Sequence, residues 1–375
     1  MPALIGLVAG EASGDVLGSH LLHGLQGRWP ALQPVGIGGP RMVAAGQEVW
    51  WPAERLSVMG YVDALKRLPE LLWIRRRLGT RLIGGGARLF VGIDAPDFNL
   101  GLEARLRGAG LKTVHYVCPS IWAWRPERVT QIRAAADHVL CLFPFEPGLL
   151  REAGVAASFV GHPLAGVIPL EPDRAAARLA LGLSAQAPVL ALLPGSRISE
   201  VALILPSMLG AARRLQAQNP GLQVVLPIAP GLRSQVETLA QGHELRLFDG
   251  QAHALLAACD LCLVASGTAT LEAALFKRPM VIAYRVSEAN HRRMRKLQLQ
   301  PWVGLPNVLA REFLVPECLQ ADCTAENLAA QAQRWLDDPA AVAALQHRFT
   351  DLHHQLHADS SQLALDALAP FLEGC

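Results

Sequence analysis

The sequence predicts an α/β protein built from two doubly wound domains. Short apolar runs alternate with longer amphipathic stretches along most of the chain, which is the pattern of parallel strands joined by helical crossovers. This series occurs twice, on either side of a proline-bearing stretch at 163–172. The length of 375 residues also exceeds what one hydrophobic core usually serves. We therefore expect two sheets that face each other across a cleft, with ligands at the carboxyl ends of the strands.

The strand candidates are short apolar runs, each followed by Gly, Pro or polar residues. They are a run that ends at Val8 and the segments 89–93, 113–117, 139–143 and 158–160, then 189–193, 224–228, 245–248, 261–264 and 280–283. From Thr324 onward only helical patterns occur. These patterns predict a first domain at 1–165, a second at 166–342, and C-terminal helices at 343–375 that pack back on the first domain.

Composition and charge exclude several classes of function. The formal net charge of +2 gives no support for a nucleic-acid partner. No apolar run approaches the roughly 18 residues that a membrane-spanning helix needs. The N-terminus lacks the basic segment of a signal peptide, and Glu11 ends its apolar stretch early. The seven cysteines show no disulfide or metal-site spacing. We expect a cytoplasmic protein with reduced thiols and without a metal or cofactor.

The strongest local signal lies in the second domain, where ASGTATLE at 265–272 follows an apolar run and opens a helix. A glycine lets a ligand approach the backbone closely, and hydroxyls and free amides at the start of a helix bind anions. A glutamate one turn further on suits hydrogen bonds to ribose hydroxyls. The alternative interpretation is a capped helix with an acidic first turn. The residues expected at this phosphate and ribose site are Ser266, Gly267, Thr268, Ala269 and Glu272.

A second loop of the same kind, PGSR at 194–197, follows the first strand of that domain. The planar guanidinium of Arg197 presents five N–H donors, a geometry that matches phosphate oxygens. In one sheet this loop should lie beside the segment 265–272. We expect Gly195, Ser196 and Arg197 to complete a diphosphate site that needs no metal. A surface arginine in a tight turn is the alternative.

Two loops of the first domain carry carboxylates directly after predicted strands, GEASGD at 10–15 and GIDAPDFN at 92–99. Asp94 stands where its strand ends and is the candidate general base, ahead of Asp97. In the alternative interpretation Asp94 caps the helix that Pro96 starts. The loop at 10–15 has no dinucleotide or Walker fingerprint, and the aspartates at 94 and 97 do not form a dedicated metal motif. The polar groups expected to bind or orient an acceptor through its sugar hydroxyls are Glu11, Ser13, Asp15, Asp97 and Asn99.

The segment CPSIWAWR at 118–125 follows another predicted strand. Aromatic faces bind sugars or acyl chains, and each large ring buries roughly 150–250 Å². Trp122 and Trp124 are therefore candidate acceptor contacts. A tryptophan-anchored corner of the core is the alternative interpretation.

A helical pattern that starts near Pro69 has two unlike faces. Ile74, Leu78 and Leu82 share one stripe, as core-facing residues do. Trp73 points the opposite way, among arginines and close to further apolar groups, a composition that a bilayer interface favours. The residues expected to contact a membrane surface are Met59, Leu65, Trp73, Arg76 and Arg77.

Taken together, these motifs resemble the lipid-A-disaccharide synthase family. The matching segments run in the family's order over nearly the whole chain and are long enough to make chance an implausible source. They are GEASGD at 10–15, GIDAPDFN at 92–99, VCPSIWAWR at 117–125, LFPFE at 142–146, FVGH at 159–162, LLPGSR at 192–197, ASGTATLE at 265–272 and LPNVL at 305–309.

The resemblance implies a GT-B fold, in which two Rossmann-like domains face each other across a cleft. It implies an inverting transfer of 2,3-diacylglucosamine from its UDP derivative to the 6-hydroxyl of 2,3-diacylglucosamine 1-phosphate (lipid X), with release of UDP. The reaction would occur at the cytoplasmic face of a Gram-negative inner membrane, on which the protein would dock peripherally. The resemblance also implies that Asn307 contacts the donor. The oligomeric state stays open, a homodimer included.

Other functions remain alternatives at this point. A sugar-nucleotide epimerase or the lipid II N-acetylglucosaminyltransferase would use the same architecture, although the segments 92–99 and 117–125 argue against both. A non-catalytic lipid-binding protein would dock on membranes without using Asp94 or Arg197. A nucleotide-cofactor oxidoreductase is disfavoured because the chain lacks the G-x-G-x-x-G fingerprint.

Overall fold

The chain folds into two compact units. The structure, a computed structural model, describes residues 3–56, 61–288, 291–292 and 297–373, and for residues 61–66 it describes the backbone alone. The first unit consists of Met1–Pro163 together with Leu356–Cys375, and the second of Leu164–Gln355. Each unit is a parallel sheet covered by helices, so the α/β class expected from the sequence is confirmed.

The sheet of the first unit has seven parallel strands in the order β3-β2-β1-β4-β5-β6-β7. Its topology reverses between β1 and β4, which lie side by side. In open α/β sheets this reversal is where ligands bind, outside the carboxyl ends of the strands. The strands are β1 (Ala3–Ala9), β2 (Leu32–Gly38), β3 (Glu48–Pro52), β4 (Leu89–Ile93), β5 (Lys112–Tyr116), β6 (His138–Cys141) and β7 (Ala157–Phe159).

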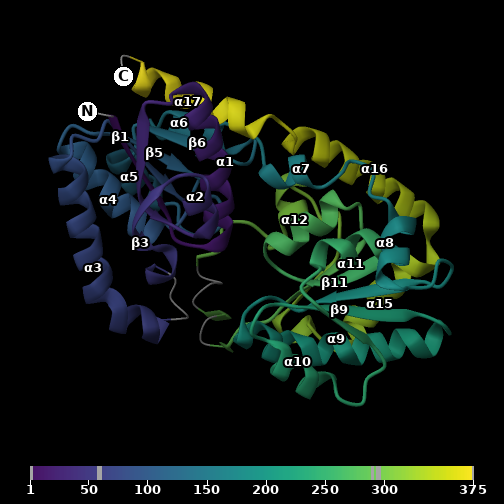
Figure 1. Ribbon diagram of the computed structural model, residues 1–375. Helices are drawn as coiled ribbons and strands as arrows, with labels where there is room; N and C mark the ends of the chain where they lie inside the picture. The colour runs from purple at the N-terminus through teal and green to yellow at the C-terminus, as the bar shows by residue number, and fades with distance from the viewer. Residues whose placement is uncertain (1–2, 57–60, 289–290, 293–296, 374–375) are drawn as a thin grey trace. The chain divides into compact units, whose positions relative to one another are not determined.

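Helices cover both faces of this sheet, because successive residues of a strand point to opposite sides. Leu7 packs with Leu22 and Leu368 on one face, and Val8 packs with Leu78 on the other. Figure 1 shows α17 lying beside α1, and the two helices are in contact. The helices of this unit are α1 (Ala12–Arg28), α2 (Pro40–Ala44), the 3-10 turn η1 (Ala53–Arg55), α3 (Tyr61–Gly84), α4 (Pro96–Gly108), α5 (Arg128–Ala135), α6 (Glu146–Glu152) and α17 (Ser360–Leu372).

The second unit repeats the same topology with six parallel strands in the order β10-β9-β8-β11-β12-β13. Here the reversal lies between β8 and β11. Both of these strands are completely buried, as expected for parallel strands with helices on both faces. The strands are β8 (Val189–Leu193), β9 (Gln223–Ile228), β10 (Arg246–Asp249), β11 (Leu261–Ala265), β12 (Met280–Tyr284) and β13 (Glu317–Leu319).

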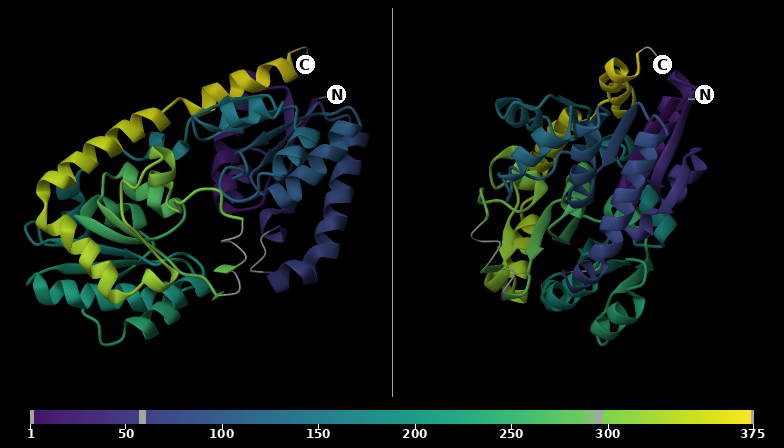
Figure 2. Two further views of the ribbon diagram at one scale, coloured as in Figure 1. Left: turned by 180° about the vertical axis from the view of Figure 1, so that it is seen from behind. Right: turned by 90° about the vertical axis from the view of Figure 1, so that its left-hand side faces the viewer.

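Helices lie on both faces of the second sheet, as Figures 1 and 2 show. On one face α9 packs along α15, and Gly210 allows the close approach, since a Cβ there would lie 2.8 Å from that of Ala325. The helical segments are α7 (Pro163–Val167), α8 (Arg174–Leu181), α9 (Ile198–Gln218), α10 (Arg233–Ala240), α11 (Ala252–Ala258), α12 (Thr268–Leu275), α14 (Leu305–Ala310), η2 (Gln320–Asp322), α15 (Ala325–Asp337) and α16 (Pro339–Leu356).

The C-terminal helices divide between the units, whereas the sequence analysis placed all of 343–375 on the first domain. Most of α16 belongs to the second unit. The buried His353 accepts a hydrogen bond from Lys277 Nζ at 2.6 Å, and the Gln346 amide donates to the carbonyl of Lys277. Only the end of α16 and α17 belong to the first unit. These polar contacts hold α16 in its place and were not visible in its helical pattern.

Candidate active site

A cavity of about 520 Å³ lies at the topological reversal of the second sheet. The segments 193–197, 227–230, 250–252 and 265–269 line it, together with Glu200 and Glu272. These segments follow β8, β9, β10 and β11, so the cavity stands at the carboxyl edge of the sheet. A volume of 300–1,000 Å³ is typical of small-molecule sites. The structure thus brings together the two loops that the sequence analysis singled out in this domain.

Arg197 lies at the N-terminus of α9, in the loop that follows β8. It is the N-cap residue of that helix, and its side chain does not cap the helix. The guanidinium is 75% exposed and Nη1 lies 2.7 Å from Glu200 Oε1. An exposed ion pair of this kind is weak, about 0.2–1 kcal/mol. An anion in the cavity can therefore compete for the guanidinium.

The loop from Ser266 to Ala269 also lines the cavity and opens α12. Gly267 has φ 146° and open space around its Cα, so a ligand can approach the backbone closely. No side chain caps α12 either. The first-turn N–H groups of α9 and α12 thus have no side-chain acceptor, and both helices begin at the cavity. The Ser266 hydroxyl is already used, since it donates to the carbonyl of Val303 at 3.0 Å.

Glu272 lies one turn into α12 and has a neighbour that sequence reasoning missed. Nε2 of His253 lies 3.5 Å from Oε1 of Glu272. The hydrogen bond with Glu272 raises the pKa of His253 above its usual value. Gln251, which starts α11 at φ 61°, also lines the cavity. The strand-glycine-helix sequence around Gly250 was the signal that could have revealed this third loop.

Asn307 has a structural role instead of the predicted donor contact. It is fully buried and does not line the cavity. Its amide nitrogen donates to the carbonyl of Val315 and to Oε1 of Glu317, and its oxygen accepts from the Val315 N–H at 3.0 Å. All of its polar atoms are thus used in holding α14 to the segment before β13.

In the first unit, Asp94 lies at the carboxyl end of β4, at the reversal of the sheet. Asp94 and Ala95 have φ values of 52° and 44°, and such left-handed non-glycine residues are strained and cluster at functional sites. Within the described part of the chain the Asp94 carboxylate has no hydrogen-bond or ion-pair partner. The loop after β1 adjoins this turn, because a Cβ on Gly10 would lie 3.1 Å from that of Ala95. The exposed Glu11 and Ser13 of that loop therefore share one edge with Asp94.

Asp97 differs from Asp94 in that its carboxylate is already paired. Arg128 Nη2 donates to its Oδ1 at 2.5 Å, and Arg125 Nη1 lies 3.9 Å away. These arginines come from the segment that follows β5. The Asp97 side chain is otherwise 85% exposed. The structure therefore joins the predicted base loop to the tryptophan-bearing loop.

Two predicted acceptor contacts are turned into the protein, and that prediction is corrected for both. The Asp15 carboxylate is buried and accepts hydrogen bonds from the N–H groups of Gly39, Arg41 and Met42, at 2.9–3.0 Å. It thereby caps α2. Asn99 is fully buried, and its amide donates to the carbonyl of Asp94 at 2.8 Å. Both side chains hold the main chain of these loops in place through hydrogen bonds to backbone groups.

The two tryptophans of the segment after β5 also differ. Trp122 is half-buried, its Nε1 donates to Glu146 Oε1 at 3.0 Å, and its ring lies edge-on to Phe145. Burial raises the pKa of the Glu146 carboxyl to about 7. Trp124 is 36% exposed, with the Arg125 guanidinium over its ring at 4.2 Å. The corner interpretation thus describes Trp122, and Trp124 is the ring that remains open to a ligand.

Comparison with known proteins identifies the family of this chain. The family model described as lipid-A-disaccharide synthetase matches residues 5–369. The chain belongs to the lipid-A-disaccharide synthase family. The synthase of Verminephrobacter eiseniae is 56% identical over 380 residues, covering 99% of this chain and 98% of that protein. That of Thiobacillus denitrificans is 52% identical over 370 residues, covering 98% and 99%. The chain is therefore a UDP-sugar glycosyltransferase of lipid A biosynthesis.

Solved structures agree on the fold of this synthase family member. A UDP-GlcNAc 2-epimerase from Neisseria meningitidis bound to UDP-GlcNAc matches with a TM-score of 0.67 at 11% identity, covering 99% of this chain and all of that one. Anabaena HepE in complex with UDP-glucose matches at 0.56 and 16%, covering 98% and 99%. These likenesses confirm the GT-B fold predicted from the sequence.

The residues predicted to touch a membrane lie on or near α3. Met59 and the side chain of Leu65 lie outside the described residues. Trp73 is 53% exposed, with Arg77 over its ring at 5.6 Å, and Arg76 is exposed as well. Among the helices described, none has the length and apolar character needed to cross a bilayer. Trp73 is thus outward-facing as predicted, and its membrane role in this synthase stays a prediction.

Proposed function

We propose that this synthase condenses UDP-2,3-diacylglucosamine with 2,3-diacylglucosamine 1-phosphate (lipid X), giving a β-1,6-linked disaccharide 1-phosphate and UDP. The observation that carries the proposal is the cavity of the second unit, where two uncapped helix starts and Arg197 meet. Such a constellation suits a diphosphate. Glu272 lies one turn further on and suits the ribose hydroxyls.

The reaction inverts the anomeric carbon in a single displacement. Asp94 accepts the proton of the 6-hydroxyl while that oxygen bonds to the anomeric carbon. The bond from this carbon to the diphosphate breaks, and UDP leaves. Asp94 suits the base because its carboxylate has no partner among the described residues, whereas Asp97 is paired with Arg128. A positioned base contributes about 10²–10⁴-fold.

Charge builds on the departing diphosphate, and the second unit supplies what stabilises it. The proposed donors are the Arg197 guanidinium and the first-turn N–H groups of α9 and α12. Removing one such stabiliser typically costs about 10²–10³-fold in rate. On the acceptor side we assign the exposed groups Glu11, Ser13 and Trp124 to lipid X, with Asp97 orienting it through its arginine partners.

The test is a coupled measurement of product and UDP. Purified protein is incubated with both substrates in the presence of a chelator, and the disaccharide is detected by mass. Asp94→Asn and Arg197→Ala should each be at least about 100-fold slower. Arg214→Ala, at the far end of the same helix as Arg197 and paired with Glu326, is the matched control and should keep the wild-type rate.

Near-wild-type rates in both variants would remove the assignment of the site. Release of UDP without lipid X would favour hydrolysis or epimerase-like chemistry over transfer.

We also propose that α3 docks on the cytoplasmic face of the inner membrane, where acylated substrates would be met. Leu68, Leu72 and Trp73 are 46%, 45% and 53% exposed along this helix. Arg76 and Arg77 follow one turn on and are exposed too. Amphipathic rings and basic groups on one helix surface suit the boundary between headgroups and acyl chains.

A further inference from the structure

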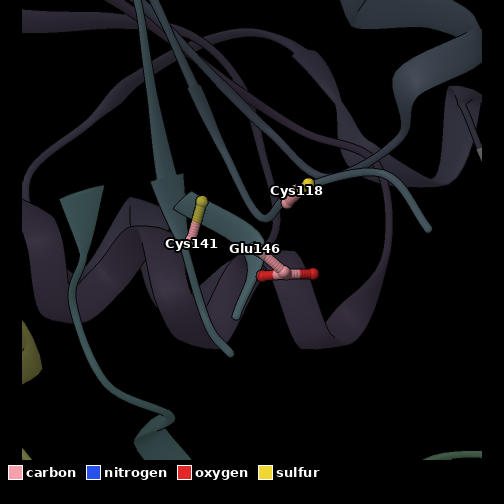
Figure 3. Close-up of side chains that lie close together, drawn as sticks. All are labelled: Cys118, Cys141 and Glu146. Carbon is pink, nitrogen blue, oxygen red and sulfur yellow. The ribbon is translucent and has the colours of Figure 1, made fainter. Parts of the chain in front are cut away.

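Three buried side chains that the proposed reaction does not use meet in the first unit. Cys118 follows β5, Cys141 ends β6 and Glu146 begins α6, and Figure 3 shows that the three side chains lie close together. One ligand atom from each lies within 4.8 Å of the other two. Because β5 and β6 are neighbouring parallel strands, their carboxyl ends bring both thiols to the same edge of the sheet. The cluster therefore follows from the topology of the fold.

The Glu146 carboxylate is buried without a cationic partner. Glu146 is only 2% exposed. Oε1 accepts from Trp122 Nε1 and Oε2 from the Phe143 N–H, both at 3.0 Å and both neutral donors. None of the ion pairs among the described residues involves Glu146. A buried carboxyl group is normally paired, bound to a metal or protonated, and a cation at this point would hold Glu146 in its charged form.

The donor set around this carboxylate indicates which cation would fit. Two thiolates and one carboxylate oxygen suit a borderline-soft divalent ion such as zinc, which is commonly held in tetrahedral geometry. In that geometry two sulfurs lie roughly 3.8 Å apart, so small movements of the present side chains would complete the site.

The hydrogen bond from Trp122 adds a support of the kind that metal sites use. Outer partners orient a ligating carboxylate by hydrogen bonding to it. Here that partner comes from the loop that also carries Trp124 and Arg125, and Cys118 begins the same loop. An ion at this point would tie the loop to α6.

We propose that Cys118, Cys141 and Glu146 bind one zinc-class divalent ion, which fixes the loop that follows β5. Both thiols lose their protons to solvent when the ion binds, and a water molecule completes the coordination. The ion takes no part in the transfer reaction. The site is independent of the donor cavity, which lies in the other unit.

Cobalt is the probe that tests the site, because thiolate ligands give bound Co²⁺ an intense near-ultraviolet charge-transfer band. The full chain is reduced, stripped with a chelator and titrated with Co²⁺ under reducing conditions. We expect one equivalent to bind with that band, and Zn²⁺ to remove it. Zn²⁺ should also raise the Tm of the stripped protein, since it binds the folded state.

Variants identify the ligands. Cys141→Ser should abolish the band, and Glu146→Gln should weaken Co²⁺ binding at least tenfold while the thiolate band remains. The matched control is Cys259→Ser, because Cys259 and Cys262 form another buried cysteine pair and lie in the other unit. It should bind Co²⁺ as the wild type does.

Several results would overturn the proposal. They are the absence of the band in the folded, reduced protein, a band that survives Cys141→Ser, and a band that disappears with Cys259→Ser. If Cys141→Ser does not fold, Cys118→Ala and Glu146→Gln carry the test, and unchanged Co²⁺ affinity in both would equally refute it. Recovery of a Cys118–Cys141 disulfide by mass, with no Co²⁺ uptake after reduction, would show a redox pair instead.

Discussion

The side-chain amide of Asn99 donates a hydrogen bond to the main-chain carbonyl of Asp94 at 2.8 Å. It also lies 3.4 Å from the carbonyls of Val8 and Ile93. One buried amide therefore gathers the ends of two neighbouring strands and the strained turn that carries the proposed base. The turn needs such support, because left-handed non-glycine residues cost about 1–3 kcal/mol each.

Loss of this amide should lower catalysis more than stability. For Asn99→Ala we expect kcat to fall at least tenfold with little change in KM, since Asp94 loses its fixed orientation. The free energy of unfolding should fall by about 1–3 kcal/mol through the carbonyls left unpaired. Asn219→Ala, which removes a helix-end amide bonded to the Leu215 carbonyl in the second unit, is the control and should lower stability only. A folded Asn99→Ala protein with wild-type kcat would contradict this role.

Asp94 and Asp97 should respond differently to the same substitution. Asp94→Asn removes the proposed base, and kcat should fall at least about 100-fold. Asp97→Asn breaks the pairing with Arg128 and should mainly raise KM for lipid X. Arg128→Gln should give the same change as Asp97→Asn, and the double variant should not be additive because the two groups act as a pair. Steady-state kinetics at varied lipid X decide the matter, and a larger kcat loss in Asp97→Asn would exchange the two roles.

A pair of glycines separates strain from ligand binding in the second unit. Gly195 and Gly221 have φ values of 107° and 89°, so Ala at either position is strained. Gly195 also lines the cavity, and a Cβ there would lie 2.6 Å from Glu200 Oε2. A Cβ on Gly221 meets nothing within 4 Å. Both variants should lose about 1 kcal/mol of stability or more. Calorimetry should show UDP affinity reduced at least tenfold in Gly195→Ala and unchanged in Gly221→Ala. Equal affinities would place UDP elsewhere.

Glu103 on α4 and His115 on β5 form a fully buried pair, in which Oε1 of Glu103 and Nδ1 of His115 lie 2.7 Å apart. Burial raises the pKa of Glu103 above 4.5, and His115 opposes that shift. A raised carboxyl pKa means that the folded state holds its proton more tightly than the unfolded state. The stability it contributes is therefore complete below 4.5 and is lost as pH rises through the raised pKa. Urea unfolding at pH values from about 4 to about 8 covers this interval. Over that range the free energy of unfolding of the wild type should fall relative to that of Glu103→Gln. A constant difference would contradict the shift.

The sequence predicted the strands that are continuous apolar runs and missed β2, β3 and β13. The segments 89–93 and 189–193 were predicted with the bounds observed, because continuous apolar runs between turns leave few alternatives. β2 contains Pro34 and two glycines and did not look like a strand. β3 is a half-exposed edge strand, and β13 has only three residues. Pairing with a neighbour decides such segments, and pairing is not visible in a local pattern.

The same limit applies to the site. Polar residues after buried strands marked loops that the topology brings to one edge of each sheet, and two of these loops line the cavity of the second unit. The direction of each side chain could not be predicted, since Asp15 and Asn99 look like ligand-binding residues but are directed into the protein. Backbone N–H and carbonyl groups within the loops are their partners. His253 was missed because its partner, Glu272, lies on another helix.

Membrane docking should depend on the exposed face of α3. Replacing Leu72 and Trp73 together, as Leu72→Ser with Trp73→Ala, removes two side chains that are each worth about 1.5–3 kcal/mol when buried. Binding to vesicles that contain phosphatidylglycerol should therefore fall at least tenfold in a sedimentation assay. Leu179→Ala, which removes an 83% exposed leucine on α8, is the matched control and should bind as wild type.

The charged part of the same face has a separate signature. Arg76→Gln with Arg77→Gln should cost about 1 kcal/mol per charge on anionic vesicles, and this loss should shrink as salt is raised. The effect of Leu72→Ser with Trp73→Ala should persist at high salt, because apolar burial is not screened. UDP affinity should stay unchanged in every one of these variants, since the cavity lies in the other unit. Equal sedimentation of wild type and both double variants would show that α3 does not meet the bilayer.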